Sequence, residues 1–283
     1  MTIKFWSTLL VLSVVILSCK KETRDIKEVQ DQEIRDFLGA SLSGFTKDTS
    51  GIYYQILTQP TGDLITNIDP IFYYQNVKTS DGTPLLNSDK FNFTNAYLTD
   101  IKPIGFNKTI FALIKKGGKI RSIIPSYLAF GKDGSGSTIK GNTLIDATFE
   151  VFNAKTPEAV NDTIITKYIK TLNLTFTRDA SGVYYNIITP GTGTTDVTLT
   201  SNITVNYVGK FFNGEQFDAS AVGSPMQTSF TGLIKGWQVL TKLKKGGKIR
   251  LLIPSQKAYG QTGSRSIPGN CPLDFEIELV DVK

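Results

Sequence analysis

The segment Thr231–Gly260, TGLIKGWQVLTKLKKGGKIRLLIPSQKAYG, contains the pattern from which the fold is predicted. Its first half spaces apolar residues as a short amphipathic helix does. Gly246–Gly247 ends that helix, because glycine tolerates the left-handed backbone of a C-terminal cap. The apolar run Ile249–Ile253, followed by a proline, is typical of a central strand. We therefore predict a helix, a turn and a buried strand, with Trp237 and Tyr259 at the floor and rim of one apolar pocket.

The core of this segment occurs twice. Residues 113–131 read LIKKGGKIRSIIPSYLAFG and residues 242–260 read KLKKGGKIRLLIPSQKAYG, 129 residues apart. A period this long indicates duplicated domains rather than a solenoid. Each copy is predicted to begin with a helix, Asp31–Leu42 or Asp162–Leu172, and to end with a strand, Leu144–Phe152 or Leu273–Val280.

Composition limits the classes of function. The chain has 283 residues, 40% hydrophobic and 20% charged, as expected of two folded domains. The net charge of +6 is spread over turns and helix faces rather than one stripe, so no nucleic-acid partner is predicted. The absence of histidine excludes histidine-based triads, acid–base mechanisms and metal sites. The acidic residues do not cluster with ligand spacing, so we predict no metal and no cofactor.

The N-terminus, MTIKFWSTLLVLSVVILSCKK, has a lysine before a short apolar run that ends at Ser18-Cys19. Such a run is typical of a signal peptide rather than a membrane span. The sequence Ile16–Cys19 resembles a bacterial lipobox, which implies a signal peptide over residues 1–18, acylation of Cys19 and a tether over residues 19–30. The protein would then be lipid-anchored in the bacterial cell envelope, at the outer membrane. A plain signal peptide or a short anchor is the alternative. Cys271, the only other cysteine, is predicted to be a small buried residue without a disulfide.

Several motifs of the second copy occur together in one order: ITVNYVGKFFNGEQFDAS at 203–220, LIKGW at 233–237, IPSQKAYG at 253–260 and LDFEIEL at 273–279. Over Gly182–Lys283 the chain resembles the FKBP-type peptidyl-prolyl isomerases. The resemblance implies an α+β fold, a twisted antiparallel sheet wrapped around a short helix, repeated in tandem. The predicted organisation is a degenerate domain over residues 31–153, a linker over 154–161 and an isomerase domain over 162–283.

Isomerisation of an X-Pro bond makes and breaks no covalent bond, so an apolar pocket that favours the twisted amide is sufficient. By resemblance, Trp237 is the floor for the proline ring. The implied catalytic set is Tyr207, Phe217, Asp218, Ile234, Trp237 and Tyr259, and the implied substrate-binding set is Leu233, Ile267, Phe275 and Phe230. Within these, the Ile234 N–H and the Tyr259 hydroxyl would donate to substrate carbonyls, and Asp218 would pair with Tyr207.

The first copy lacks most of this set. Alignment on the repeated motif gives the replacements Gln75 for Tyr207, Leu85-Leu86 for Phe217-Asp218, Phe130 for Tyr259, Ala147 for Phe275, and Lys108 for Trp237, although Phe106 could substitute with a small slip. We therefore predict that the first copy is catalytically inactive.

The sequence thus predicts a peptidyl-prolyl isomerase that acts on proline-containing polypeptide chains among exported or envelope proteins. The alternatives are a non-catalytic chaperone or protein-binding lipoprotein, and a purely structural envelope lipoprotein. The completeness of the second pocket favours the enzyme. Two departures from the family pattern are Ser264 and Ser266, which lie where members often carry a histidine and a second aliphatic residue.

Overall fold

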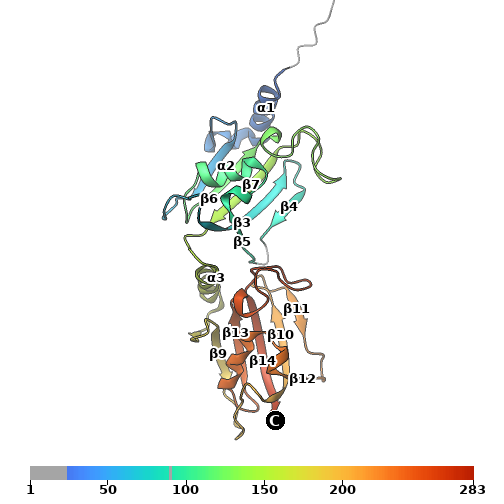
Figure 1. Ribbon diagram of the computed structural model, residues 1–283. Helices are drawn as coiled ribbons and strands as arrows, with labels where there is room; N and C mark the ends of the chain where they lie inside the picture. The colour runs from blue at the N-terminus through green and yellow to red at the C-terminus, as the bar shows by residue number, and fades with distance from the viewer. Residues whose placement is uncertain (1–23, 89–90) are drawn as a thin grey trace, which may run out of the picture.

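The computed structural model describes residues 24–88 and 91–283, and it contains two antiparallel sheets, one in each half of the chain (Figure 1). The predicted signal peptide and Cys19 lie outside the described residues. We call the two halves the first unit, residues 26–151, and the second unit, residues 157–282. The α+β fold class predicted from the sequence is confirmed.

The first unit has two α-helices and seven strands. They are α1 (Ile26–Leu38), β1 (Thr46–Lys47), β2 (Tyr53–Thr58), β3 (Pro70–Thr79), β4 (Pro84–Asn87), β5 (Thr94–Tyr97), α2 (Ile104–Ala112), β6 (Lys119–Ile124) and β7 (Ile145–Val151), with short 3-10 turns at Gly39–Gly44, Leu98–Asp100 and Ser126–Leu128.

The second unit repeats this plan, with a 3-10 helix in place of α2. Its elements are α3 (Pro157–Leu172), β8 (Thr177–Arg178), β9 (Tyr184–Thr189), β10 (Asn202–Lys210), β11 (Gln216–Ala219), β12 (Met226–Ser229), the 3-10 helix η5 (Lys235–Lys242), β13 (Lys248–Ile253) and β14 (Leu273–Val282), with 3-10 turns at Phe230–Gly232 and Ser255–Lys257.

The two sheets share one strand order. The first runs β1-β2-β6-β7-β3-β4 with β5 also on β3, and the second runs β8-β9-β13-β14-β10-β11 with β12 also on β10. β7 and β14 each begin with three buried residues, after which buried residues alternate with more accessible ones, as expected where one face of a strand packs on the core. The inner face of each sheet packs against α2 or η5, whose apolar side chains belong to the same core cluster as the strands.

Helix α1 begins earlier than the sequence predicted, at Ile26 rather than Asp31. The Asp25 side chain accepts a hydrogen bond from the Lys27 N–H and caps the helix, and Gly39, at φ 49°, follows its last residue. Part of the predicted tether is therefore helical. Within it, Gln30 is fully buried and accepts the backbone N–H of Ser126.

The predicted linker, residues 154–161, contains the first turn of α3. Thr156 caps this helix, and Pro157 occupies its first turn, where a missing N–H costs nothing. Asn161 is fully buried and accepts the backbone N–H of Ser255 at 3.0 Å, as Gln30 does from Ser126 in the first unit. The connection is thus an integral part of the second unit.

Aromatic side chains join the two units beside α3, which lies at their junction in Figure 1. The ring of Phe212 stacks on that of Tyr168, with centroids 4.0 Å apart, and Phe91 of the first unit lies 5.8 Å from Phe212. The Asn270 amide also donates to the carbonyl of Phe93 across the junction. The units are therefore packed against each other rather than connected only by the chain.

Candidate functional site

The candidate site of the second unit is a cluster of aromatic rings on the inner face of its sheet. Trp237 from η5 lies edge-on to Tyr207 of β10, with centroids 5.3 Å apart, and edge-on to Phe275 of β14, at 5.4 Å. Phe217 of β11 lies 5.5 Å from Phe275 at 84°. Four residues that are far apart in the sequence therefore form one set of perpendicular rings, the arrangement that aromatic quadrupoles favour.

The remaining predicted residues pack against the same cluster. Ile267 and Phe230 are buried within it, and the partly buried side chains around it are Leu233, Ile234 and Tyr259. The carbonyl of Ile234 accepts a hydrogen bond from the backbone N–H of Trp237 at 3.0 Å, so the backbone itself sets the start of η5. The structure thus brings every predicted apolar residue of the site to one place.

A glycine that sequence reasoning did not select makes this ring packing possible. Gly209 pairs with Phe275 across β10 and β14. A Cβ atom on Gly209 would lie 2.7 Å from Cζ of Phe217 and 2.8 Å from Cε1 of Phe275. Carbon contacts are normally about 3.5–4.0 Å, so only glycine leaves space for both rings. An isolated glycine inside a strand pattern is the sequence signal for such a close approach.

Polar groups lie at the edge of the ring cluster. The Tyr207 hydroxyl donates to Oδ2 of Asp218 at 2.8 Å, and Oδ1 of the same carboxylate accepts the Ala219 N–H at 3.0 Å. Burial and the hydrogen bond to Asp218 raise the pKa of Tyr207 to about 12. Burial and the nearby Asp218 charge also raise the pKa of Tyr259. Both phenols therefore stay protonated and able to donate at neutral pH.

The floor of the site contains an unpaired donor. Trp237 is 3% exposed, and its indole Nε1 is buried without a hydrogen-bond partner among the described residues. A buried donor without an acceptor costs about 1–3 kcal/mol. The site therefore combines apolar walls with a donor that the protein leaves unsatisfied.

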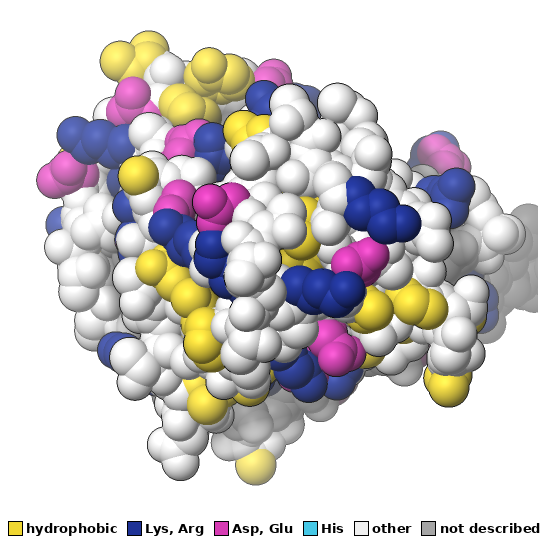
Figure 2. Space-filling model, turned by 90° about the horizontal axis from the view of Figure 1, so that it is seen from below, with side chains coloured by type: hydrophobic (Ala, Val, Ile, Leu, Met, Phe, Trp, Pro, Cys, Tyr) yellow, Lys and Arg dark blue, Asp and Glu magenta, His cyan; other side chains and the backbone are white. Residues whose placement is uncertain are grey.

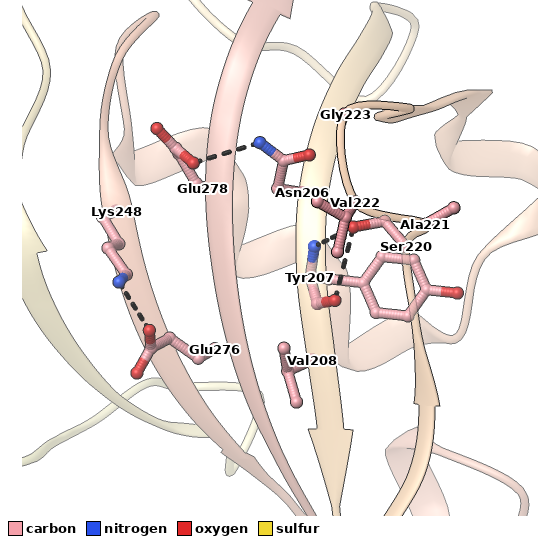
Figure 3. Close-up of a pocket in the computed structure, with 10 residues that line it drawn as sticks. All are labelled: Asn206, Tyr207, Val208, Ser220, Ala221, Val222, Gly223, Lys248, Glu276 and Glu278. Carbon is pink, nitrogen blue, oxygen red and sulfur yellow. Dashed lines mark hydrogen bonds and ion pairs between the residues drawn. The ribbon is translucent and has the colours of Figure 1, made fainter.

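A different pocket lies at the outer surface of the same strands (Figure 3). Lys248 pairs with Glu276 there at 2.5 Å, and the Asn206 amide donates to Glu278. Of the predicted site residues, only Tyr207 also lines this pocket. Figure 2 shows the molecule from the second unit's end, and basic and acidic side chains are interspersed over the end seen there. The ring cluster, rather than this charged pocket, has the chemistry expected of the predicted site.

Strand register in the first unit supports most of the predicted replacements. Val77 pairs with Leu86 and with Ala147, as Gly209 pairs with Asp218 and with Phe275 in the second unit. Gln75 pairs with Phe149, as Tyr207 pairs with Ile277. Leu86 and Ala147 therefore lie where the second unit has Asp218 and Phe275, and Gln75 lies where it has Tyr207.

The replacement of Trp237 is Phe106, not Lys108. A Cβ on Gly105 would meet Cγ2 of Ile124, and a Cβ on Gly236 would meet Cγ2 of Ile253, so the two glycines are equivalent and Phe106 follows the first. Phe106 is 3% exposed and packs on Phe149. Alignment on the lysine-glycine motif put Lys108 first and Phe106 second, because α2 is an α-helix with more residues before that motif than η5 has.

The residue at the Ile234 position in the first unit is Pro103. Its carbonyl accepts the Phe106 N–H at 3.0 Å, as that of Ile234 accepts the Trp237 N–H. Proline has no backbone N–H, so the donor assigned to Ile234 by resemblance is missing here. Sequence reasoning did not find this difference, because it depends on the same shift in the helix.

The structure describes residues 24–88 and 91–283. Within that part of the chain, no group of three His, Cys, Asp or Glu side chains is placed to hold a metal ion. No helix there is long and apolar enough to cross a bilayer. Cys271 is buried.

Comparison with known proteins finds relatives of the second unit. Residues 193–280 match the model of the FKBP-type peptidyl-prolyl cis-trans isomerases. FkpA of Escherichia coli K12, named as an isomerase of this type, is 40% identical over 106 residues, 37% of this chain and 39% of FkpA. The isomerase Mip of Coxiella burnetii is 38% identical over 107 residues, 37% of this chain and 46% of Mip.

A crystal structure of Escherichia coli FkpA aligns with 35% identity and a TM-score of 0.41, over 44% of this chain and 61% of that one. The chain spans less than half the length of FkpA and Mip in the sequence matches. The matched region contains the ring cluster, Asp218 and the loop with Tyr259. Through residues 193–280, the chain is thus similar to the FKBP-type peptidyl-prolyl cis-trans isomerases.

Proposed function

We propose that the second unit is a peptidyl-prolyl cis-trans isomerase that acts on X-Pro bonds of exported or envelope proteins. The observation that carries the proposal is the ring set formed by Tyr207, Phe217, Trp237 and Phe275, closed at one edge by the Tyr207–Asp218 hydrogen bond. Sheet packing alone does not require a carboxylate at the edge of an aromatic cluster. In a site for a proline ring and its flanking amide, the carboxylate has a use, because it holds the Tyr207 hydroxyl at the edge of the rings.

The physical task is to lower a rotational barrier. Planarity of the amide is worth roughly 18–20 kcal/mol, and the unassisted exchange takes tens of seconds or more. The twisted amide has lost its resonance and therefore its charge separation. A dry, apolar site favours it over either planar form, so the barrier falls without any covalent step.

The roles follow from position. Trp237, which is 3% exposed, is the floor under the proline ring. Tyr207 is held in place by Asp218, which thus acts as a positioning residue. The Ile234 N–H and the Tyr259 hydroxyl donate to carbonyls that flank the proline. The apolar sides of the site are Phe217, Phe275, Leu233, Ile267 and Phe230.

The first unit is proposed to be a second, degenerate FKBP-like domain without isomerase activity. Its strand order is that of the second unit, which supports a common origin. Phe106, at the Trp237 position, retains a ring, but the hydroxyls of Tyr207 and Tyr259 are replaced by Gln75 and Phe130. Pro103 removes the backbone donor. The apolar floor is kept while the donors to a peptide backbone are lost.

Acylation of Cys19 is proposed to anchor the chain in the bacterial cell envelope, at the outer membrane, where substrates would be exported proteins. The support is the lipobox-like sequence Ile16–Cys19 after an apolar run. Several acyl chains give stable membrane attachment, whereas one is marginal. Cys19→Ala should abolish labelling with a radioactive fatty acid; unchanged labelling would disprove the anchor.

The isomerase proposal is tested with the full chain and a short proline peptide whose cis–trans exchange is followed optically. Trp237→Ala should reduce the rate to the uncatalysed value, and Asp218→Val should reduce it severalfold by releasing Tyr207. Leu57→Ala, an exposed residue of β2 in the first unit, is the control and should not change the rate. Equal rates in all four proteins would remove the enzymatic claim. Residual catalysis in Trp237→Ala that a Phe106→Leu change removes would show that the first unit is active.

A further inference from the structure

The first unit has an apolar cleft where the second unit has its ring cluster. The cleft has a volume of about 610 Å³, within the range of small-ligand sites. Its lining is mostly apolar and comprises Val77, Pro84, Leu85, Leu86, Lys102, Pro103, Phe106, Phe130, Ser135, Thr138 and Ile139. We propose that this cleft binds an apolar side chain of an extended polypeptide, next to an acidic residue of that polypeptide, and holds it without isomerising any bond.

The position of the cleft supports a polypeptide as the occupant. Leu86 and Phe106 correspond to Asp218 and Trp237, as register and the two equivalent glycines show. Ser135 pairs with Ile139 in the loop over the cleft, as Ser264 pairs with Ile267 in the second unit. The same strands, helix and loop that surround the isomerase site therefore surround this cleft.

The cleft of the first unit lacks polar groups that the corresponding site of the second unit has. Pro103 lacks the N–H, Phe130 lacks the phenol, and Leu86 lacks the carboxylate of the corresponding residues in the second unit. A backbone amide would find few partners here, and burial of an unpaired amide is unfavourable. An apolar side chain loses nothing by entering, so the cleft selects side chains rather than proline amides.

Residues at two paired strand positions differ between the units. In the second unit, Gly209 leaves space for the rings of Phe217 and Phe275. In the first unit, Val77 fills the glycine position, and Ala147 replaces the phenylalanine. The Phe275 ring therefore has no counterpart at this strand position, and Val77 lines the cleft. Leu86, 43% exposed at the rim, then offers apolar surface that a ligand can cover.

The charge of Lys102 gives the cleft a preference for an acidic residue next to the bound side chain. Lys102 is the only charged residue among those that line the cleft, and it is exposed to solvent. No described carboxylate lines the cleft beside it. An acidic residue of the bound chain would therefore meet one unopposed positive charge, whereas a basic residue would be repelled. An exposed pair of this kind changes affinity by at most about fivefold.

The inference uses the proposed isomerase site only as a guide to position, so either can fail while the other stands. Two dye-labelled, proline-free peptides serve as probes: one with a Leu-Phe-Leu centre followed by two glutamates, and its twin with two lysines. Fluorescence anisotropy with the full chain measures their affinities. Trp237→Ala tests whether binding depends on the second unit.

We expect saturable binding of the glutamate peptide by the wild type and equal binding by Trp237→Ala. Leu86→Asp, which introduces the residue type of the second unit at an exposed position, should weaken binding at least about tenfold. Leu57→Asp is the matched control, since Leu57 is 46% exposed in the same sheet but lies on β2, which three strands separate from β4. Lys102→Glu should reverse the preference between the two peptides.

The proposal is overturned by any of three results. The first is no saturable binding of either peptide. The second is loss of binding in Trp237→Ala, which would assign the peptide to the second unit. The third is that Leu86→Asp and Leu57→Asp bind the glutamate peptide with equal affinity and that Lys102→Glu leaves the peptide preference unchanged. Circular dichroism of each variant confirms that it is folded.

Discussion

Replacement of Gly209 by alanine tests whether the ring cluster depends on the space that this glycine leaves. The added methyl would lie 2.7 and 2.8 Å from ring atoms of Phe217 and 2.8 Å from one of Phe275. A normal contact requires about 3.5 Å or more, so both rings must move by roughly 0.7 Å. The Phe217 ring is in contact with Phe211, and the Phe275 ring with Trp237, so the movement spreads through the site.

Overpacking of this kind costs about 1–3 kcal/mol. We therefore expect Gly209→Ala to lower the free energy of unfolding of the second unit by that amount and to reduce the isomerase rate. Urea unfolding followed by Trp237 fluorescence measures the first quantity. The chain has two tryptophans, so the measurement uses a Trp6→Phe background.

Gly232→Ala is the control, because a Cβ there meets no atom within 4 Å and the backbone has no positive φ. It should change the unfolding free energy by less than about 0.5 kcal/mol.

A second comparison uses the pair found in the first unit. Phe275→Ala alone should cost about 3–5 kcal/mol. Gly209→Val with Phe275→Ala should cost less than the sum of the two single changes, by about 0.5–3 kcal/mol. Equal behaviour of Gly209→Ala and Gly232→Ala, or strict additivity of the pair, would refute the reasoning.

Three further predictions concern ionisation, a buried ion pair and the junction. The pKa of Tyr207 is raised to about 12 from 10.0, chiefly by burial and then by Asp218. Its contribution to stability is therefore complete below pH 10 and is lost as the pH rises through 12. Tyr207→Phe should remove this part of the loss of stability at alkaline pH in urea titrations, and an unchanged pH profile would contradict the assignment. Arg250→Met removes the guanidinium that lies 2.6 Å from Asp274, whose side chain is 4% exposed, and leaves this buried charge with the Tyr168 hydroxyl as a donor. The change should cost about 3–5 kcal/mol. Recovery in Arg250→Met with Asp274→Leu is expected, and a loss below 1 kcal/mol in the single variant would argue against the buried ion pair. Phe212→Ala removes the ring that lies 5.8 Å from Phe91 of the first unit. It should increase the radius of gyration measured by X-ray scattering while the isomerase rate is kept. An unchanged scattering profile would show that this contact does not hold the units together.

Much of the fold could be predicted from the sequence, because its signals are local. Alternation of apolar residues indicates strands, and a repeated Lys-Lys-Gly-Gly motif indicates a second copy of the same element order. The resemblance of residues 203–279 to one family selected the ring residues. The structure brings these rings together. The boundaries of α1 and α3 were less predictable, because they depend on capping by Asp25 and Thr156 and on burial of polar side chains.

What the sequence by itself determined is the α+β class, the duplicated order of elements and the residue types available at each strand position. Only the tertiary structure decided that Phe106 rather than Lys108 replaces Trp237, that Pro103 removes a donor, and that Gly209 leaves space for two rings. The physical reason is that a contact between rings, or a cleft between a helix and a sheet, depends on how far each element extends before it packs. Sequence spacing fixes the order of residues along an element but not the residue that its neighbour meets in space.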